Sequence, residues 1–180
     1  MKLLPQNSLL LILDIQEKLT PHIYDYQNML DRIQCLVKGF QALDITIAVN
    51  EQYKKGLGET VKEIAEFTVN YPHFEKVSFS GLADLNTAKF IQQSQKQQII
   101  LCGIESHICV LQTALDLIEK GLQPVVVWDA VGSRKIEDKE LAKLRLINAG
   151  AILTSTESIL FELCQSAKNP AFKTISQLVK

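Results

Sequence analysis

Apolar segments of two kinds alternate along the chain of 180 residues. Some are short, uninterrupted and rich in β-branched residues, which is typical of strands buried in a parallel sheet. In the others, apolar residues recur every three or four positions, which indicates amphipathic helices. The predicted strands cover residues 8–13, 45–49, 99–102, 124–129 and 151–153, with one more short strand near the start of 71–81. The predicted helices cover residues 26–43, 60–67, 84–95, 107–120, 138–148, 154–164 and a short segment from 170.

This alternation predicts an α/β fold with three layers, in which helices cover both faces of a mainly parallel six-stranded sheet of Rossmann-like type. Neither a linker nor an internal repeat interrupts it, so we expect residues 1–180 to form a single domain. Ligands of such sheets bind beyond the carboxyl ends of the strands. The polar residues that follow the strands should therefore converge at one edge; they are Asp14, Asn50-Glu51-Gln52, the segment from Gly103 onward and Asp129.

Composition narrows the class of protein. Hydrophobic residues make up 47% of the chain and charged residues 22%, as in ordinary globular proteins. The net charge of −1 provides no basic field for nucleic acid or an anionic membrane, and the apolar run at 9–13 is too short to cross a bilayer. The cysteines, at 35, 102, 109 and 164, form neither a CxxC pair nor a zinc-binding spacing. We therefore expect a cytoplasmic protein that acts on a small molecule.

The stretch from Gln98 to Glu119 contains the strongest candidate for chemistry. Its strand ends at Gly103, and Ser106 is in the place where a helix N-cap is expected. Cys109 then lies in the first turn of the helix, where unpaired N–H groups and the helix dipole stabilise a thiolate. Cys109 could be a nucleophile with a depressed pKa or a small core residue, and its position considered alone favours the core residue.

Two charged residues could complete a site around Cys109. Asp14 follows the first strand, and Lys76 lies in the segment 74–80. Taken singly, Asp14 could be a cap and Lys76 a solvated surface residue. Together with Cys109 they supply a base, a cation that stabilises a thiolate, and a helix start that binds an oxyanion. His107 is only two residues from Cys109, so on a helix it should point away from the sulfur.

Five segments spread over nearly the whole chain carry a family resemblance. They are 11–16 (LILDIQ), 51–58 (EQYKKGLG), 75–80 (EKVSFS), 101–110 (LCGIESHICV) and 155–163 (STESILFEL). In this combination the chain resembles the isochorismatase-like cysteine hydrolase superfamily, and within it the small metal-free isochorismatase-domain branch. The resemblance implies a catalytic triad of Asp14, Lys76 and Cys109. It also implies a cis peptide bond between Ile104 and Glu105, and an oxyanion hole formed by the backbone N–H groups of Glu105 and Cys109.

The sequence departs from one part of the superfamily pattern. Nicotinamidases carry an Asp-x-His metal motif after the second strand, where this chain has Asn50-Glu51-Gln52. We therefore expect no metal and no other cofactor, and nicotinamide is in doubt as the substrate. We expect Gln16, Gln52, Tyr53 and Phe79 to contact whatever substrate binds.

The resemblance implies a cysteine hydrolase that cleaves a small amide or a related C–N bond through a thioester-type intermediate. Hydrolysis of a vinyl ether is an alternative that Cys109 disfavours, since true isochorismatases lack this cysteine. A catalytically silent oligomeric binding or scaffold protein is the third possibility. The superfamily also implies a homo-oligomer, for which the amphipathic segment 171–179 and the loop 52–58 are candidate contacts. Segment 171–179 could equally pack on its own core.

Overall fold

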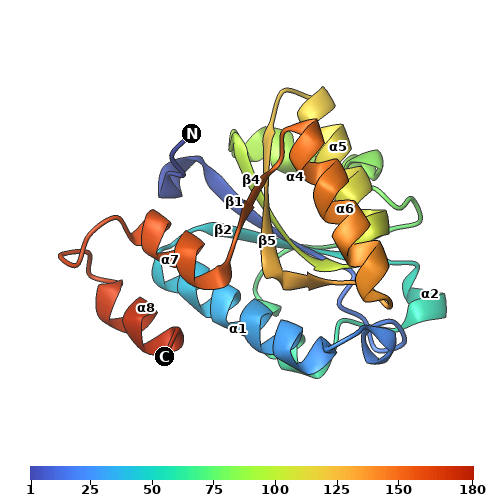
Figure 1. Ribbon diagram of the computed structural model, residues 1–180, viewed down its shortest axis with the longest axis horizontal. Helices are drawn as coiled ribbons and strands as arrows, with labels where there is room; N and C mark the ends of the chain where they lie inside the picture. Colours follow the sequence, from blue (N-terminus) through green and yellow to red (C-terminus); the bar gives the residue numbers. More distant parts are fainter.

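The computed structural model describes residues 1–180 and contains one six-stranded sheet with helices on both faces (Figure 1). The strands are β1 (Ser8–Leu13), β2 (Thr46–Gln52), β3 (His73–Lys76), β4 (Gln98–Ile104), β5 (Gln123–Gly132) and β6 (Ile152–Thr154). They lie in the order β3-β2-β1-β4-β5-β6, and every neighbouring pair is parallel. The predicted three-layer α/β fold is confirmed, and the sheet is entirely rather than mainly parallel.

The helices cover the two faces of this sheet as separate layers. They are α1 (Tyr26–Ala42), α2 (Lys54–Leu57), α3 (Lys62–Thr68), α4 (Leu85–Ser94), α5 (Leu111–Glu119), α6 (Ile136–Ala149), α7 (Thr156–Cys164) and α8 (Phe172–Leu178). Figure 1 shows α1, α7 and α8 on one face and α4, α5 and α6 on the other. None of the helices combines the length and the apolar character needed to span a membrane.

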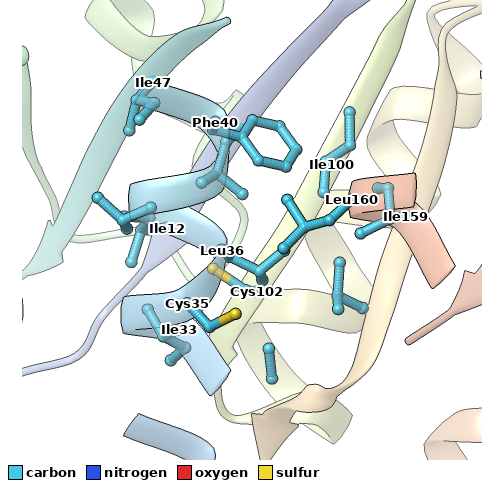
Figure 2. Packing of buried hydrophobic residues seen from close by; sticks show 14 of the residues in the cluster. Ile12, Ile33, Cys35, Leu36, Phe40, Ile47, Ile100, Cys102, Ile159 and Leu160 are labelled. Carbon is cyan, nitrogen blue, oxygen red and sulfur yellow. The ribbon is translucent and has the colours of Figure 1, made fainter. Parts of the chain in front are cut away.

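Two apolar clusters join these layers to the sheet. The larger one contains Ile12 and Ile100 from the strands together with Phe40 of α1 and Leu160 of α7, and Figure 2 shows Ile100 beside Leu160. Leu11 of β1 belongs to the second cluster, on the opposite face. Each fully buried side chain of this size contributes about 1.5–3 kcal/mol. Because β1 is buried on both faces, a run of apolar residues without alternation is what its position requires.

The backbones of β1 and β4 approach each other closely at Gly103. A Cβ added at Gly103 would lie 2.0 Å from the carbonyl oxygen of Leu13. The φ angle of Gly103 is +114°, a conformation that a side chain makes unfavourable. Glycine is therefore required here, and the close approach sets Asp14, the residue after β1, beside the segment that follows β4.

Two local predictions were wrong. Ser106 does not cap a helix, because its hydroxyl donates a 2.8 Å hydrogen bond to the carbonyl of Gly132. It begins a π-helical turn, Ser106–Val110, that precedes α5. Asp129 does not lie at a strand end, because β5 continues to Gly132; its carboxylate instead accepts hydrogen bonds from the backbone and side chain of Thr156 at the start of α7.

Candidate active site

The candidate site lies where β1 ends between β2 and β4. The chain leaves β1 for β2 on one side and returns to β4 on the other, so this point is the topological switch at which ligands of open α/β sheets bind. Asp14 is the first residue after β1, and its φ of +57° is a left-handed conformation that Asp adopts more readily than most residues. Its N–H donates to the carbonyl of Asn50 at 3.1 Å. This turn holds a fully buried carboxylate at the switch point.

Lys76, the last residue of β3, points its ammonium group at Asp14. The distance from Lys76 Nζ to Asp14 Oδ2 is 2.8 Å, and the two side chains are 0% and 1% exposed. The ammonium group also donates to Gln52 Oε1 at 2.7 Å and to the carbonyls of Ser78 and Phe79 at 3.3 and 3.2 Å. A buried charge is tolerated only with such partners. The structure thus brings together two of the three residues of the predicted triad in direct contact.

Cys109 lies in the π-helical turn after β4 and is 7% exposed. Burial raises the pKa of its thiol to about 12; the charge of Asp14 adds to this effect, and the ammonium of Lys76 opposes it. Burial likewise raises the pKa of Asp14, whereas Lys76 and the neighbouring Cys109 thiol lower it. Asp14 Oδ1 is buried and has no hydrogen-bond partner. The sulfur therefore lies next to the ion pair, but the prediction of a depressed pKa for Cys109 was wrong.

The segment between β4 and Cys109 contains the two backbone N–H groups predicted to form an oxyanion hole, those of Glu105 and Cys109. The peptide bond between Ile104 and Glu105 is cis. The N–H of Glu105 has no acceptor within the chain, and Cys109 lies in the first helical turn, where N–H groups commonly lack partners. The Glu105 carboxylate accepts from the backbone N–H and Nε of Arg134, at 3.0 and 3.1 Å. His107 contacts Ser133 Oγ at 3.0 Å through Nδ1, and it makes no hydrogen bond to the sulfur.

The four residues predicted to contact substrate have different environments. Gln16 is fully buried, and its amide group binds only backbone, so it shapes the loop after β1 instead of facing a ligand. Gln52 is half-buried and binds Lys76. Tyr53 and Phe79 are exposed, at 48% and 55%. Tyr53 and Phe79 therefore remain available to a substrate, while the two glutamines are engaged within the protein.

A second charged cluster beside the ion pair was missed at the sequence level. Glu51 of β2 is 2% exposed, and Thr60 donates to its Oε1 through the backbone N–H (3.1 Å) and the hydroxyl (2.7 Å). Lys54 Nζ lies 3.1 Å from its Oε2. Burial alone would raise the pKa of Glu51, but the nearby His73 ring and the donor groups of Thr60 and Lys54 lower it to about 2. The only sequence signal was an acidic residue at the end of an apolar strand.

The residues in the place of the nicotinamidase metal motif are engaged in hydrogen bonds within the protein. Asn50 Nδ2 donates to Thr87 Oγ1 at 2.7 Å, and Gln52 Oε1 accepts from Lys76. No group of three or more His, Cys, Asp or Glu side chains is arranged so that it could hold a metal ion. Asn50 Oδ1 is buried without a hydrogen-bond partner, but two neutral amides without a His, Cys or carboxylate do not form a metal site of the usual type.

Comparison with known proteins identifies the family. The model of the isochorismatase domain matches residues 8–158. The chain belongs to the isochorismatase family. This confirms the resemblance inferred from the sequence segments.

Relatives and solved structures agree with this assignment to the isochorismatase family. Isochorismatase domain-containing protein 2 of Danio rerio is 39% identical over 178 residues, which cover 99% of this chain and 89% of that protein. The structure of MAR1 ribonuclease from Caenorhabditis elegans superposes with a TM-score of 0.94 at 38% identity and covers 99% of this chain and 92% of that one. YcaC from Pseudomonas aeruginosa, at 21% identity, shares the fold with a TM-score of 0.93 over 98% of this chain and 91% of its own.

Proposed function

We propose that this member of the isochorismatase family is a cysteine hydrolase that cleaves a small amide or a related C–N bond. The observation that carries the proposal is the buried Asp14–Lys76 pair, 2.8 Å apart, with the Cys109 thiol acting on the pKa of Asp14. A buried ion pair adds little net stability compared with apolar packing. Strongly perturbed titratable groups gathered at a ligand-binding edge are instead typical of active sites.

In the first half-reaction, the Cys109 sulfur attacks the carbonyl carbon of the substrate while Asp14 removes the thiol proton. The raised pKa of Asp14 makes its carboxylate a stronger base, which narrows the gap to the thiol pKa of about 12. The N–H groups of Glu105 and Cys109 stabilise the oxyanion of the tetrahedral intermediate. The C–N bond then breaks, the leaving nitrogen takes the proton from Asp14, and the acyl group stays on sulfur as a thioester.

In the second half-reaction, water attacks the thioester carbonyl and gives its proton to Asp14. The carbon–sulfur bond breaks, the acid product leaves, and the proton on Asp14 returns to the sulfur. Lys76 keeps a positive charge beside both groups, so that negative charge can pass from Asp14 to the sulfur and back without leaving an unpaired ion in the protein interior.

Cleavage of RNA is a second candidate, because the C. elegans relative at 38% identity is named a ribonuclease. Two features of this chain disfavour it. The net charge is −1, which gives no attraction for a polyanion. The candidate nucleophile is 7% exposed, which suits a small substrate better than a nucleic-acid backbone.

A substrate panel tests the proposal. Small amides, ureas, carbamoyl compounds, a vinyl ether and an RNA oligonucleotide are incubated with the wild type and with Cys109→Ala. We expect the wild type to release ammonia or an amine from at least one C–N substrate, with an acyl adduct on Cys109 detected by mass spectrometry. Cys109→Ala should release none. Cys35→Ala, which removes another buried thiol, is the matched control and should retain activity. Turnover that survives in Cys109→Ala, or cleavage of RNA alone, would reject the proposal.

A further inference from the structure

The side chain of Gln52 connects the buried lysine to the neighbouring strand. Gln52 and Lys76 are paired residues at the ends of β2 and β3, so their side chains leave the sheet side by side. Gln52 Oε1 lies 2.7 Å from Lys76 Nζ, and Gln52 Nε2 donates to the carbonyl of Val77 at 2.8 Å. The Gln52 amide thus binds two groups: its oxygen accepts from the Lys76 ammonium group, and its nitrogen donates to the backbone that follows Lys76.

The backbone of Gln52 is itself held by the side chain of Gln16. Pairing between β1 and β2 ends at Leu13 and Asn50, so the end of β2 has no strand beside it on that edge. Gln16 takes that place. Its Oε1 accepts from the N–H of Gln52 at 2.7 Å, and its Nε2 donates to the Gln52 carbonyl at 2.9 Å and to that of Gly58 at 2.7 Å. These two bonds to Gln52 imitate a strand partner.

A lysine ammonium group needs several hydrogen-bond acceptors if it is to be held in one position. Its ammonium group sits on a flexible four-carbon stem with three rotatable donors, and a single ion pair does not fix it. Asp14 and Gln52 are the two side chains that accept from Lys76; the other two acceptors are backbone carbonyls. A neutral amide accepts a hydrogen bond without adding a second negative charge, so the ammonium charge stays available to Asp14 and to the sulfur.

The geometry points to Gln52 as a positioning residue that fixes the Lys76 ammonium group between Asp14 and Cys109. Gln16 in turn holds the backbone of Gln52. The consequence for catalysis rests on the proposed function, but the positioning of Lys76 does not. This role replaces the substrate contact that the sequence predicted for Gln52.

The first experiment observes Lys76 directly in full-length protein without any substrate. Protein labelled with ¹⁵N on lysine should show a slowly exchanging ammonium signal from Lys76, assigned by its absence in Lys76→Arg. Gln52→Met keeps the length of the side chain but removes the acceptor, so the signal should broaden or disappear. Gln41→Met, in which a glutamine on α1 loses its bond to the Phe67 carbonyl, is the matched control and should leave the signal unchanged. A Lys76 signal identical in the wild type and Gln52→Met would overturn the inference.

Kinetics then separate positioning from substrate contact, using any substrate found in the panel. We expect Gln52→Met to lower kcat by about tenfold or more, since small displacements of a catalytic group are costly. KM should stay within about twofold of the wild type, because a residue that does not touch the substrate leaves ground-state binding intact. Gln52→Glu retains the acceptor but adds a charge that competes for the ammonium group, so its activity profile should shift to higher pH. A raised KM with unchanged kcat would overturn the inference and restore the substrate contact. If the wild type turns over no substrate, the proposed function fails while the NMR result still decides the role of Gln52.

Discussion

Lys76 Nζ lies 2.8 Å from Asp14 Oδ2 although 62 residues separate them in sequence and β2 lies between their strands. Asp14 leaves β1 through a left-handed turn, and Lys76 ends β3, so the ion pair passes over the carboxyl end of β2. Gln52, at that end, accepts from the same ammonium group. The ion pair therefore depends on the relative positions of the carboxyl ends of β1, β2 and β3. These ends lie together at the switch point of the sheet.

The pH dependence of thiol alkylation should report the raised pKa of Cys109. With a pKa of about 12 the thiol is neutral at pH 7, so we expect iodoacetamide to react slowly there and faster as the pH rises into the alkaline range. Lys76→Met should slow the reaction further, because it removes the cation that opposes burial. Mass spectrometry of the Cys109 peptide measures the rate, with the Cys35 peptide as the internal comparison. A rate that reaches its plateau below the ordinary thiol pKa of about 8.5 would contradict this prediction.

Activity should not depend on a metal ion. Asn50 and Gln52, in the place of a metal motif, are bonded to Thr87 and Lys76, and they offer no ligand set of the usual kind. We expect turnover of the best substrate to be unchanged after dialysis against EDTA and phenanthroline, with metal content verified by mass spectrometry. Activity that is lost on chelation and returns with zinc or iron would show that the expectation is incorrect.

Glu51 should make the protein sensitive to acid. Its pKa falls from 4.5 to about 2 on folding, so its ionised form stabilises the fold above pH 4.5, and this contribution is lost as the pH falls toward 2. Glu51→Gln should cost about 1–3 kcal/mol at pH 7, as expected for a buried, hydrogen-bonded group, and much less at pH 3. Urea unfolding at the two pH values measures this difference.

The control for Glu51 is Glu66→Gln, which removes an exposed ion pair with Lys62 at 3.6 Å. Exposed pairs of this kind contribute about 0–1 kcal/mol, so the free energy of unfolding should hardly change. Equal losses for Glu51→Gln at pH 7 and pH 3 would indicate a packing effect and not an electrostatic one.

We also predict a homo-oligomer, but through other surfaces than α8. Ile175 of α8 is fully buried in the larger core cluster, and the ring of Phe172 packs against Phe161 of α7, so this helix already has an apolar partner. Large apolar side chains remain exposed on α6, in the segment after β3 and at the start of α4; they are Leu141, Leu144, Ile147, Val77, Phe79 and Leu85. A stable contact should bury more than roughly 1,000 Å² in total.

Light scattering at micromolar concentration measures the mass. We expect more than one subunit, and a smaller mass for either Leu144→Glu or Val77→Glu, depending on which surface is used. Val69→Glu, at the exposed residue that follows α3, is the control and should leave the mass unchanged. A mass of one subunit that persists on concentration would refute the prediction.

The sequence by itself determined the fold and the identity of the three central side chains. Uninterrupted apolar runs such as Ser8–Leu13 occur where a strand is buried on both faces, and their alternation with amphipathic helices leaves few topologies other than a doubly wound parallel sheet. Asp14 could be selected because it directly follows a strand of that sheet, and Cys109 because it lies in the first helical turn after another strand. Lys76 was selected as a cation that could stabilise a thiolate, and the family resemblance implied the same three residues. The selection of these residues did not require the solvent exposure of any side chain to be known.

Only the tertiary structure decided the burial, the pKa and the hydrogen-bond partners of the side chains at the site. The pKa of Cys109 was predicted from its helix position and the nearby lysine, but burial and the charge of Asp14 outweigh both, since desolvation depends on everything packed around the sulfur. Gln16 and Gln52 were predicted to contact the substrate. Their actual partners, the unpaired edge of β2 and the Lys76 ammonium group, exist only once three strands are aligned in register. Hydrophobic periodicity indicates which face of a helix or strand is buried. It does not indicate which group on another element will bind a polar side chain.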